Sequence, residues 1–131
     1  MNDNTHKIGL WGEDVAAGYL EKKGYTILDR NFHTPVGEID IVAACQDVDS
    51  SCLVFVEVKT RTRDDLGYPE ESINRKKWNH LQAAIQVYLT SHLDIKVDWR
   101  VDVISIVGQP SQDHPQITHF ENVLMFDERE I

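Results

Sequence analysis

The chain has 131 residues, of which 41% are apolar and 27% are charged. A chain of this length is expected to form one domain that spans residues 1–131, since domains usually hold roughly 100 to 200 residues. The composition is typical of soluble globular proteins. The longest apolar run, residues 41–45, is far shorter than the roughly 18 residues of a membrane helix. Residues 1–10 are polar and lack the apolar core of a signal peptide. The sequence therefore predicts a cytoplasmic protein with no membrane partner.

The charge balance is acidic, with 13 Lys and Arg against 22 Asp and Glu and a net charge of −9. Such a charge repels nucleic acid at long range. Residues 47–77 nevertheless hold a basic group, which consists of Lys59, Arg61, Arg63, Arg75, Lys76 and Lys77. A local basic face and an ordinary solvated surface both fit this distribution. The two cysteines, Cys45 and Cys52, are expected to be reduced in a cytoplasmic protein.

The first predicted element is a helix over residues 6–23. Its apolar stripe has spacings of three and four residues, and Gly24 follows as a C-cap; the stripe consists of Ile8, Trp11, Val15 and Tyr19. A short β-prone segment at residues 25–28 leads to a turn signal at residues 34–37.

A β-hairpin comes next, with strands over residues 38–43 and 53–59 and a polar loop over residues 46–51. Apolar residues at helical spacing then predict a second helix over residues 71–90. Two further strands are expected at residues 97–107 and 117–126. The predicted order is helix, three strands, helix, two strands.

Charged side chains interrupt the two apolar strands of this hairpin. Glu57 and Lys59 share one face of their strand, because strand side chains alternate with period two, and Val54, Val56 and Val58 take the other face. Asp40 lies in an equally apolar context on the preceding strand, and pairing of the two strands would bring it beside Glu57. Two neighbouring carboxylates repel unless a cation lies between them. Oxygen ligands of this kind suit Mg²⁺ or Mn²⁺, and Lys59 could face a phosphate or a metal-bound water.

The residues alone leave a second interpretation open, in which Asp40, Glu57 and Lys59 form a buried ion-pair network with no other role. Glu13 lies at the edge of the first helix's apolar stripe and could face the sheet or the solvent. Lys77 lies on the stripe of the second helix, where a snorkelling lysine is equally compatible. The sequence has no zinc-ligand spacing, Gly-rich phosphate loop or nucleophile-elbow motif.

An acid on the first helix, GEID on one strand and FVEVKTR on the next resemble the restriction-endonuclease-like PD-(D/E)xK nucleases. Within them, the chain resembles the small bacterial YraN-like family, which is similar to archaeal Holliday-junction resolvases. The matching positions run from about Gly9 to Phe126 and include Gly12, Glu13, Arg30, Asn31, Gly37, Asp40, Glu57, Lys59, Thr60, Arg61, Gly67, Pro69, Lys77 and Leu81. Ile39 stands where the usual motif has proline, as is common in the resolvase-like branch.

The resemblance implies a three-layer α/β core with a central mixed sheet flanked by helices. It also implies hydrolysis of phosphodiester bonds in nucleic acid, most simply DNA and including branched or junction DNA, with a 5′-phosphate product. Asp40 and Glu57 would bind Mg²⁺ or Mn²⁺ with the backbone carbonyl of Val58, and Glu13 would contribute directly or through water. Lys59 would orient or activate the attacking water.

Phosphate contacts would come from Lys77, Arg61 and Arg63. Since resolvase-like proteins pair to cut two strands, the resemblance also implies a homodimer, although no apolar stripe identifies an interface. A different class of function is a non-catalytic module that keeps the nuclease fold for binding nucleic acid or another protein, which the acidic charge balance supports.

Overall fold

The computed structural model describes residues 3–47, 50–62, 74–92, 98–111 and 114–123, and these form two helices and five strands. Their order is the predicted one: α1 (Asp3–Lys22), β1 (Thr26–Thr34), β2 (Gly37–Asp47), β3 (Ser50–Arg61), α2 (Arg75–Ser91), β4 (Asp98–Val107) and β5 (Gln116–Phe120). The termini of these elements differ from the sequence-based bounds by several residues at some ends, as described below.

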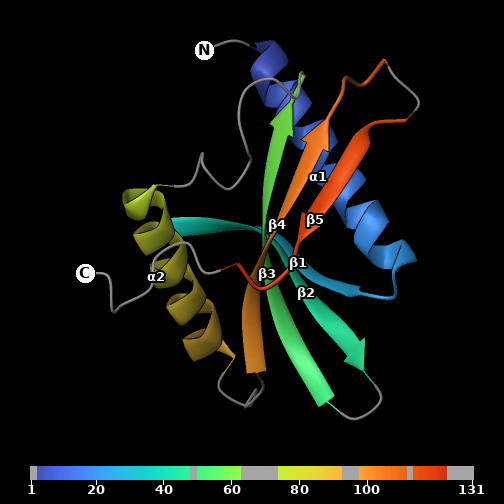
Figure 1. The fold of residues 1–131 in the computed structure, drawn as a ribbon. Helices are drawn as coiled ribbons and strands as arrows, with labels where there is room; N and C mark the ends of the chain where they lie inside the picture. The colour runs from blue at the N-terminus through green and yellow to red at the C-terminus, as the bar shows by residue number, and fades with distance from the viewer. Residues whose placement is uncertain (1–2, 48–49, 63–73, 93–97, 112–113, 124–131) are drawn as a thin grey trace.

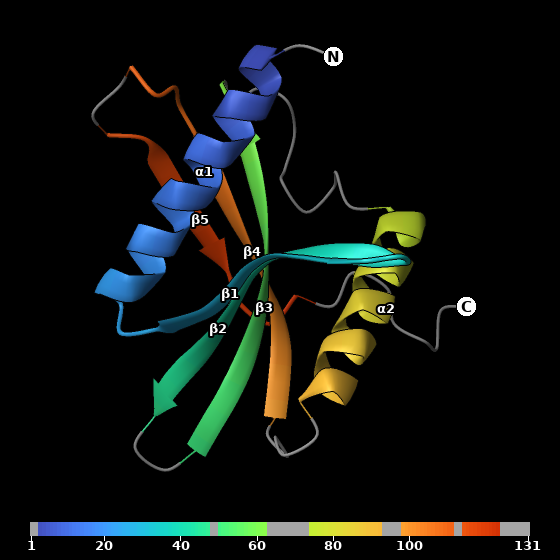
Figure 2. The same cartoon turned by 180° about the vertical axis from the view of Figure 1, so that it is seen from behind.

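The strands make one sheet in the order β1-β2-β3-β4-β5. Its neighbours are antiparallel except β3 and β4, which are parallel and are connected through α2. Helix α1 lies against one face of the sheet and α2 against the other, as the two opposite views show (Figures 1 and 2). The predicted three-layer α/β core with a mixed sheet is therefore confirmed.

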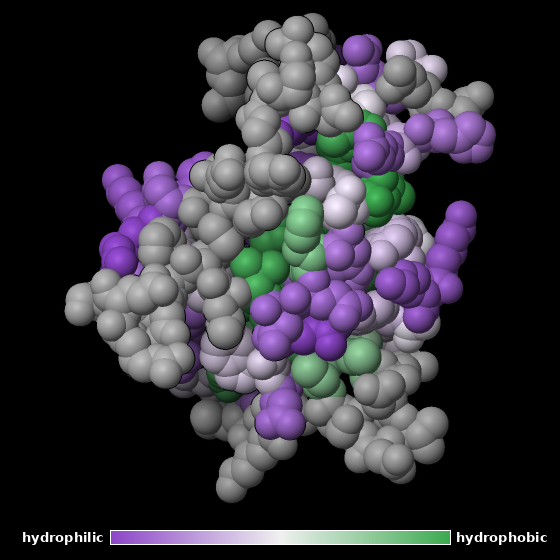
Figure 3. Space-filling view, viewed as in Figure 1, coloured by the Kyte–Doolittle hydropathy of each residue, from purple (hydrophilic) through white to green (hydrophobic). Residues whose placement is uncertain are grey.

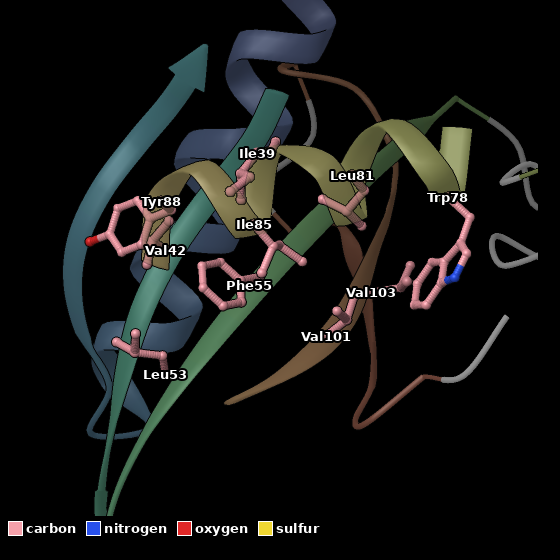
Figure 4. Packing of buried hydrophobic residues seen from close by; sticks show 11 residues of the cluster. Ile39, Val42, Leu53, Phe55, Trp78, Leu81, Ile85, Tyr88, Val101 and Val103 are labelled. Atoms are coloured by element: carbon pink, nitrogen blue, oxygen red, sulfur yellow. The ribbon is translucent and has the colours of Figure 1, made fainter. Parts of the chain in front are cut away.

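The layer between α2 and the sheet is the larger apolar cluster. Helix α2 buries five side chains at spacings of three and four residues, Trp78, Leu81, Ala84, Ile85 and Tyr88. They point at the sheet residues Ile39, Val42, Leu53, Phe55, Val101 and Val103 (Figure 4). The rings of Phe55 and Tyr88 meet edge to face with centroids 5.7 Å apart, an arrangement that adds to the free energy gained by burial.

The layer between α1 and the sheet contains smaller side chains. Ala16, Ala17 and Leu20 of α1 are buried against a sheet surface that includes Ile41, Ala43, Val54, Val56, Ile104 and Ile106. The predicted stripe is therefore rotated: Trp11, Val15 and Tyr19 lie half-buried at the rim of this cluster. Alanines take the centre because they let the helix approach the sheet closely.

Several element boundaries differ from the prediction. Strands β2 and β3 extend into the polar loop predicted over residues 46–51, because β2 continues to Asp47 and β3 begins at Ser50. Helix α1 begins at Asp3 and ends before Gly24, whose φ of 96° fits the expected C-cap. Helix α2 begins at Arg75 rather than at residue 71, because the extended Asn74 caps it and its side chain accepts a hydrogen bond from the Lys77 N–H at 2.9 Å. Strand β1 is longer than residues 25–28, and β5 ends at Phe120; residues 124–126 of the expected last strand lie outside the described part of the chain.

The face of the molecule seen in Figure 3 shows little contiguous apolar area among the described residues. In the view of Figure 3, hydrophobic residues are confined to a narrow band near the centre, beside hydrophilic ones. Large exposed apolar side chains occur singly on α1, β1, the β1–β2 turn and α2, at Leu10, Leu28, Val36 and Val87. Neither described helix is long and apolar enough to cross a membrane.

Candidate functional site

The candidate site lies where strands β2 and β3 separate. Their pairing ends with Ile41 opposite Val56, although β3 continues beside β4 as far as Arg61. Beyond this pair, the backbone N–H of Val58 on β3 donates a hydrogen bond to Oδ2 of Asp40 at 2.8 Å. A carboxylate therefore accepts the bond that a backbone carbonyl accepts elsewhere in the sheet. The separation of the two strands therefore leaves a gap that contains an acidic side chain.

An irregularity in the first two strands turns Asp40 into this gap. Ile39 and Val42 both pack on the α2 side of the sheet, whereas Ile41 packs on the α1 side, so the strict alternation of β2 is broken around Asp40. Opposite it, between the residues of β1 that pair with Ile39 and Ile41, Asn31 has a left-handed φ of 54°. Asparagine is one of the few side chains that adopt this conformation readily.

Helix α1 places Glu13 over the same gap. A Cβ on Gly12 would overlap the side chain of Thr60 on β3, so the glycine allows α1 to lie directly on the end of that strand. The next residue, Glu13, lies close enough to Asp40 and Asn31 for both side chains to shift its pKa. Burial, followed by the charge of Asp40, raises the pKa of Glu13 from 4.5 to about 7.

Glu57 and Lys59 complete the polar group from strand β3. The Lys59 Nζ lies 3.5 Å from Oε1 of Glu57, and both side chains are largely buried. Burial and then the charge of Asp40 raise the pKa of Glu57 to about 7, although Lys59 opposes this shift. Burial also raises the pKa of Asp40 in spite of its hydrogen bond from Val58. Three acids therefore share a region that disfavours their ionisation.

Two clefts open from this group of acids. The larger, which we term the α1 cleft, has a volume of about 1000 Å³, and its lining includes Glu13, Asn31, Glu38, Asp40, Glu57, Val58 and Arg61. The smaller, the α2 cleft, has a volume of about 450 Å³, and its lining includes His33, Glu38, Glu57, Lys59, Lys77 and His80. His33, Glu38 and Glu57 line both, so the two clefts adjoin at these residues.

The narrow wall of the α2 cleft depends on a glycine. A Cβ on Gly37 would overlap the backbone carbonyl of His80, so the β1–β2 turn can contact helix α2 only because residue 37 has no side chain. Thr34 closes the turn, since its hydroxyl accepts hydrogen bonds from the N–H groups of Val36 and Gly37 at 3.1 and 3.0 Å. The glycine of the GEID segment therefore has a structural explanation.

A family model described as "Uncharacterised protein family UPF0102" matches residues 12–106. The chain belongs to this family. A UPF0102 protein of Syntrophotalea carbinolica is 42% identical over 120 residues, covering 92% of this chain and 93% of that protein. Another from Syntrophomonas wolfei is 44% identical over 118 residues, covering 90% and 97%. Neither the family description nor these names state an activity, and the predicted YraN-like membership is confirmed.

The UPF0102 chain brings together most of the residues that its sequence singled out. Glu13, Asp40, Glu57, Val58 and Arg61 line the α1 cleft, and Lys59 and Lys77 line the α2 cleft. Lys77 is exposed at the first turn of α2, so its predicted place on the apolar stripe does not bury it. Arg63 lies outside the described residues.

The structure adds residues that sequence reasoning missed. Asn31 lies opposite Asp40 and lowers the pKa of the neighbouring Glu13, and its only signal in the sequence is the Arg30-Asn31 pair of the resemblance. His80 and His33 line the α2 cleft. No spacing rule connects them to Glu57, because His33 comes from strand β1 and His80 from helix α2, which are far apart in sequence.

The donor set of the site suits a hard cation but is not arranged as a finished metal centre. Its side-chain donors are carboxylate oxygens, the ligand type of Mg²⁺ and Mn²⁺. Within the described residues, however, no three His, Cys, Asp or Glu side chains are positioned to hold a metal ion as they stand.

Proposed function

We propose that this chain is a metal-dependent nuclease that hydrolyses phosphodiester bonds in nucleic acid, with Mg²⁺ or Mn²⁺ as its cofactor. The observation that carries the proposal is the gap between β2 and β3, where Asp40 is held by the Val58 N–H and faces two acids whose pKa values are raised to about 7. Acids whose ionisation is disfavoured without a counter-ion are frequent at functional sites.

A divalent cation fits the chemistry of this gap. In a strand, the N–H and C=O of one residue point to the same side, so the Val58 carbonyl faces the gap together with the N–H that binds Asp40. Asp40, Glu57 and this carbonyl would hold the ion, and Glu13 would contact it directly or through water. When bound, such a metal stabilises the charge that develops on phosphate oxygens and makes hydroxide available near neutral pH.

The remaining residues of the site have roles that follow from charge and position. Lys59, whose Nζ lies 3.5 Å from Oε1 of Glu57, would orient the attacking water and offset charge on the phosphate. Arg61 in the α1 cleft and Lys77 in the α2 cleft would contact phosphates on either side. Arg63 is proposed to act with them on the basis of the sequence.

DNA is the proposed substrate class, and branched DNA is included in it by the resemblance to junction resolvases. The net charge of −9 would slow the approach of any polyanion. Binding is therefore expected to be local and strongly dependent on salt, since a few cations at the clefts must provide most of the attraction.

A non-catalytic binding module is the second candidate, and one observation favours it. The described acids are not arranged as a finished metal site, as would be expected if the fold had been kept for binding alone. On this alternative, Lys59, Arg61 and Lys77 would bind phosphates while Asp40 and Glu57 only support the fold.

The test is incubation of labelled duplex, branched and single-stranded DNA, and of RNA, with Mg²⁺ or Mn²⁺ at low salt. Cleavage by the wild-type chain, lost in Asp40→Asn and Glu57→Gln and retained in Asp98→Asn, would support the nuclease. Asp98 is an exposed acid at the start of β4 and serves as the matched control. Binding without cleavage of any substrate would favour the module.

A further inference from the structure

Cys45 and Cys52 lie directly opposite each other on strands β2 and β3. Opposing residues of antiparallel strands have Cα atoms about 4.5 or 5.5 Å apart, which falls within the separation of about 4.4 to 6.8 Å found across disulfides. Both side chains pack at the edge of the α1-side cluster, so they point to the same face of the sheet. Two thiols are therefore held where one bond could join them.

The two thiols are also within reach of solvent. Both are free and half-buried, which leaves room for a small oxidant to approach. The Sγ of Cys52 donates to the backbone carbonyl of Leu53 at 3.5 Å, a weak contact that a disulfide could replace. In these respects the pair differs from structural cysteines that are sealed in a core.

We propose that Cys45 and Cys52 form a reversible redox site, which a peroxide closes into a disulfide across the β2–β3 hairpin. One thiolate attacks the peroxide, takes one oxygen as a sulfenic acid and releases an alcohol or water. The second thiol then attacks that sulfur and expels water, which forms the S–S bond. Two electrons pass from the thiols to the peroxide, and a dithiol reductant reverses the step.

The surroundings of Cys52 disfavour its thiolate form near neutral pH. Burial raises the pKa of the Cys52 thiol, and the guanidinium of Arg100 opposes that shift. The Cys52 pKa is raised further by the charges of Cys45, Asp98 and Asp102. The charge of Cys45 also raises the pKa of the neighbouring Tyr25 hydroxyl. Since the thiolate is the reactive form, the disulfide should form slowly near neutral pH and faster as the pH rises.

The redox site lies on the same two strands as the acids of the clefts, but at another part of the hairpin. Asp40 precedes Cys45 on β2 and Glu57 follows Cys52 on β3, and four residue pairs, from Ile41–Val56 to Ala44–Leu53, lie between. A disulfide would tie these strands together without occupying either cleft. The proposal therefore does not depend on nuclease activity.

The test is treatment of the folded wild-type chain with an alkyl hydroperoxide, followed by a thiol-blocking maleimide and mass measurement. We expect a monomer that has lost two hydrogens, carries no maleimide and recovers both labels after dithiothreitol. Its rate of formation should increase from about pH 7 to about pH 9. Peptide mapping should place the bond between Cys45 and Cys52.

Matched variants separate this reaction from ordinary thiol oxidation. Cys45→Ser and Cys52→Ser should each keep one thiol, yield a sulfenic acid that dimedone traps and form no internal bond. The proposal would be overturned if the oxidised wild-type chain formed only disulfide-linked dimers or sulfinic acids. It would equally fail if both thiols still took maleimide after exposure that oxidises the single-cysteine variants.

Discussion

Glu57 lies among groups that oppose its ionisation. Its largely buried carboxyl faces the charge of Asp40, and Lys59 compensates only in part, so its pKa rises from 4.5 to about 7. In the unfolded chain the same carboxyl loses its proton near its ordinary pKa. The folded state therefore keeps this proton over a pH range in which the unfolded state has released it.

We predict that the free energy of unfolding of the metal-free protein falls as the pH rises from about 4.5 to about 7. Above that range the Glu57 carboxyl should change it little. One pKa unit corresponds to about 1.4 kcal/mol, so the effect of Glu57 is on the order of 3 kcal/mol. Glu57→Gln should flatten this decline and make the metal-free protein more stable at about pH 8. Urea unfolding with chelator across the pH range measures it, with the exposed Glu21→Gln as control. An unaltered decline in Glu57→Gln would contradict the prediction.

Two substitutions of Asp40 distinguish the effect of its charge from the effect of its hydrogen bond with Val58. Asp40→Asn keeps an oxygen that can accept from the Val58 N–H, whereas Asp40→Ala leaves that N–H without its partner. We predict that the alanine variant is less stable than the asparagine variant by about 1 to 3 kcal/mol. Millimolar Mn²⁺ should raise the melting temperature of the wild-type chain but of neither variant. A wild-type melting temperature that Mn²⁺ leaves unchanged would count against a metal site here.

Lys59 distinguishes a reaction role from a structural one. Lys59→Ala should leave Asp40 and Glu57 able to bind metal while removing the cation beside Glu57. We expect cleavage to fall by roughly 100-fold or more, as for loss of other groups that stabilise developing charge, with DNA binding in Ca²⁺ largely retained. A buried ion pair with no other role predicts instead a loss of about 3 to 5 kcal/mol in stability and no specific loss of cleavage.

At the scale of the elements, local sequence patterns predict the order of helices and strands. Strand periodicity also predicts that Glu57 and Val56 lie on opposite faces of the sheet, as they do. The patterns fail where a contact between elements determines which side chain is buried or where it points. The apolar stripe of α1 was assigned to its larger side chains, but Ala16 and Leu20 are the residues that the sheet buries completely. The turn of Asp40 toward the gap depends on the φ of Asn31 on another strand, which periodicity along one strand does not contain.

Two glycines of α1 provide a direct test of how that helix is positioned. A Cβ at Gly12 would overlap Thr60 on β3, whereas a Cβ at Gly18 meets no atom within 4 Å. Gly12→Ala should therefore destabilise the protein by about 1 to 3 kcal/mol, as overpacking does, and displace Glu13 from Asp40. Gly18→Ala should be neutral or stabilising by up to about 1 kcal/mol, because alanine favours a helix. Chemical denaturation compares them, and equal stabilities would show that α1 does not need this close approach.

At the scale of the whole molecule, a polar network centred on Asp102 connects α1, β4 and β5. Asp102 is fully buried; its Oδ2 lies 2.7 Å from Nε2 of His119, and its Oδ1 accepts from Arg100 Nε at 3.0 Å. His119 continues to the Tyr19 hydroxyl at 3.1 Å. Sequence reasoning did not find this network, because Asp102 and His119 are joined only by the pairing of β4 with β5 and the position of α1.

Asp102 should contribute to stability in the opposite pH sense to Glu57. Burial alone would raise its pKa, but hydrogen bonds from His119, Arg100 and the Asn122 N–H lower it below 3.8. An acid with a lowered folded-state pKa stabilises the protein fully above its unfolded pKa, and this stabilisation is lost as the pH falls through the folded value.

We therefore predict that Asp102→Asn costs about 3 to 5 kcal/mol at neutral pH, because it removes the buried charged partner of Arg100 and leaves only the exposed Glu121 at 4.0 Å. The difference from wild type should persist down to about pH 4 and narrow below it. Asp98→Asn, an exposed acid on the same strand, should change stability by less than about 0.5 kcal/mol. Denaturant unfolding of both variants at several pH values measures this. If Asp102→Asn were as mild as Asp98→Asn at neutral pH, the network would not be what joins α1 to the β4–β5 edge.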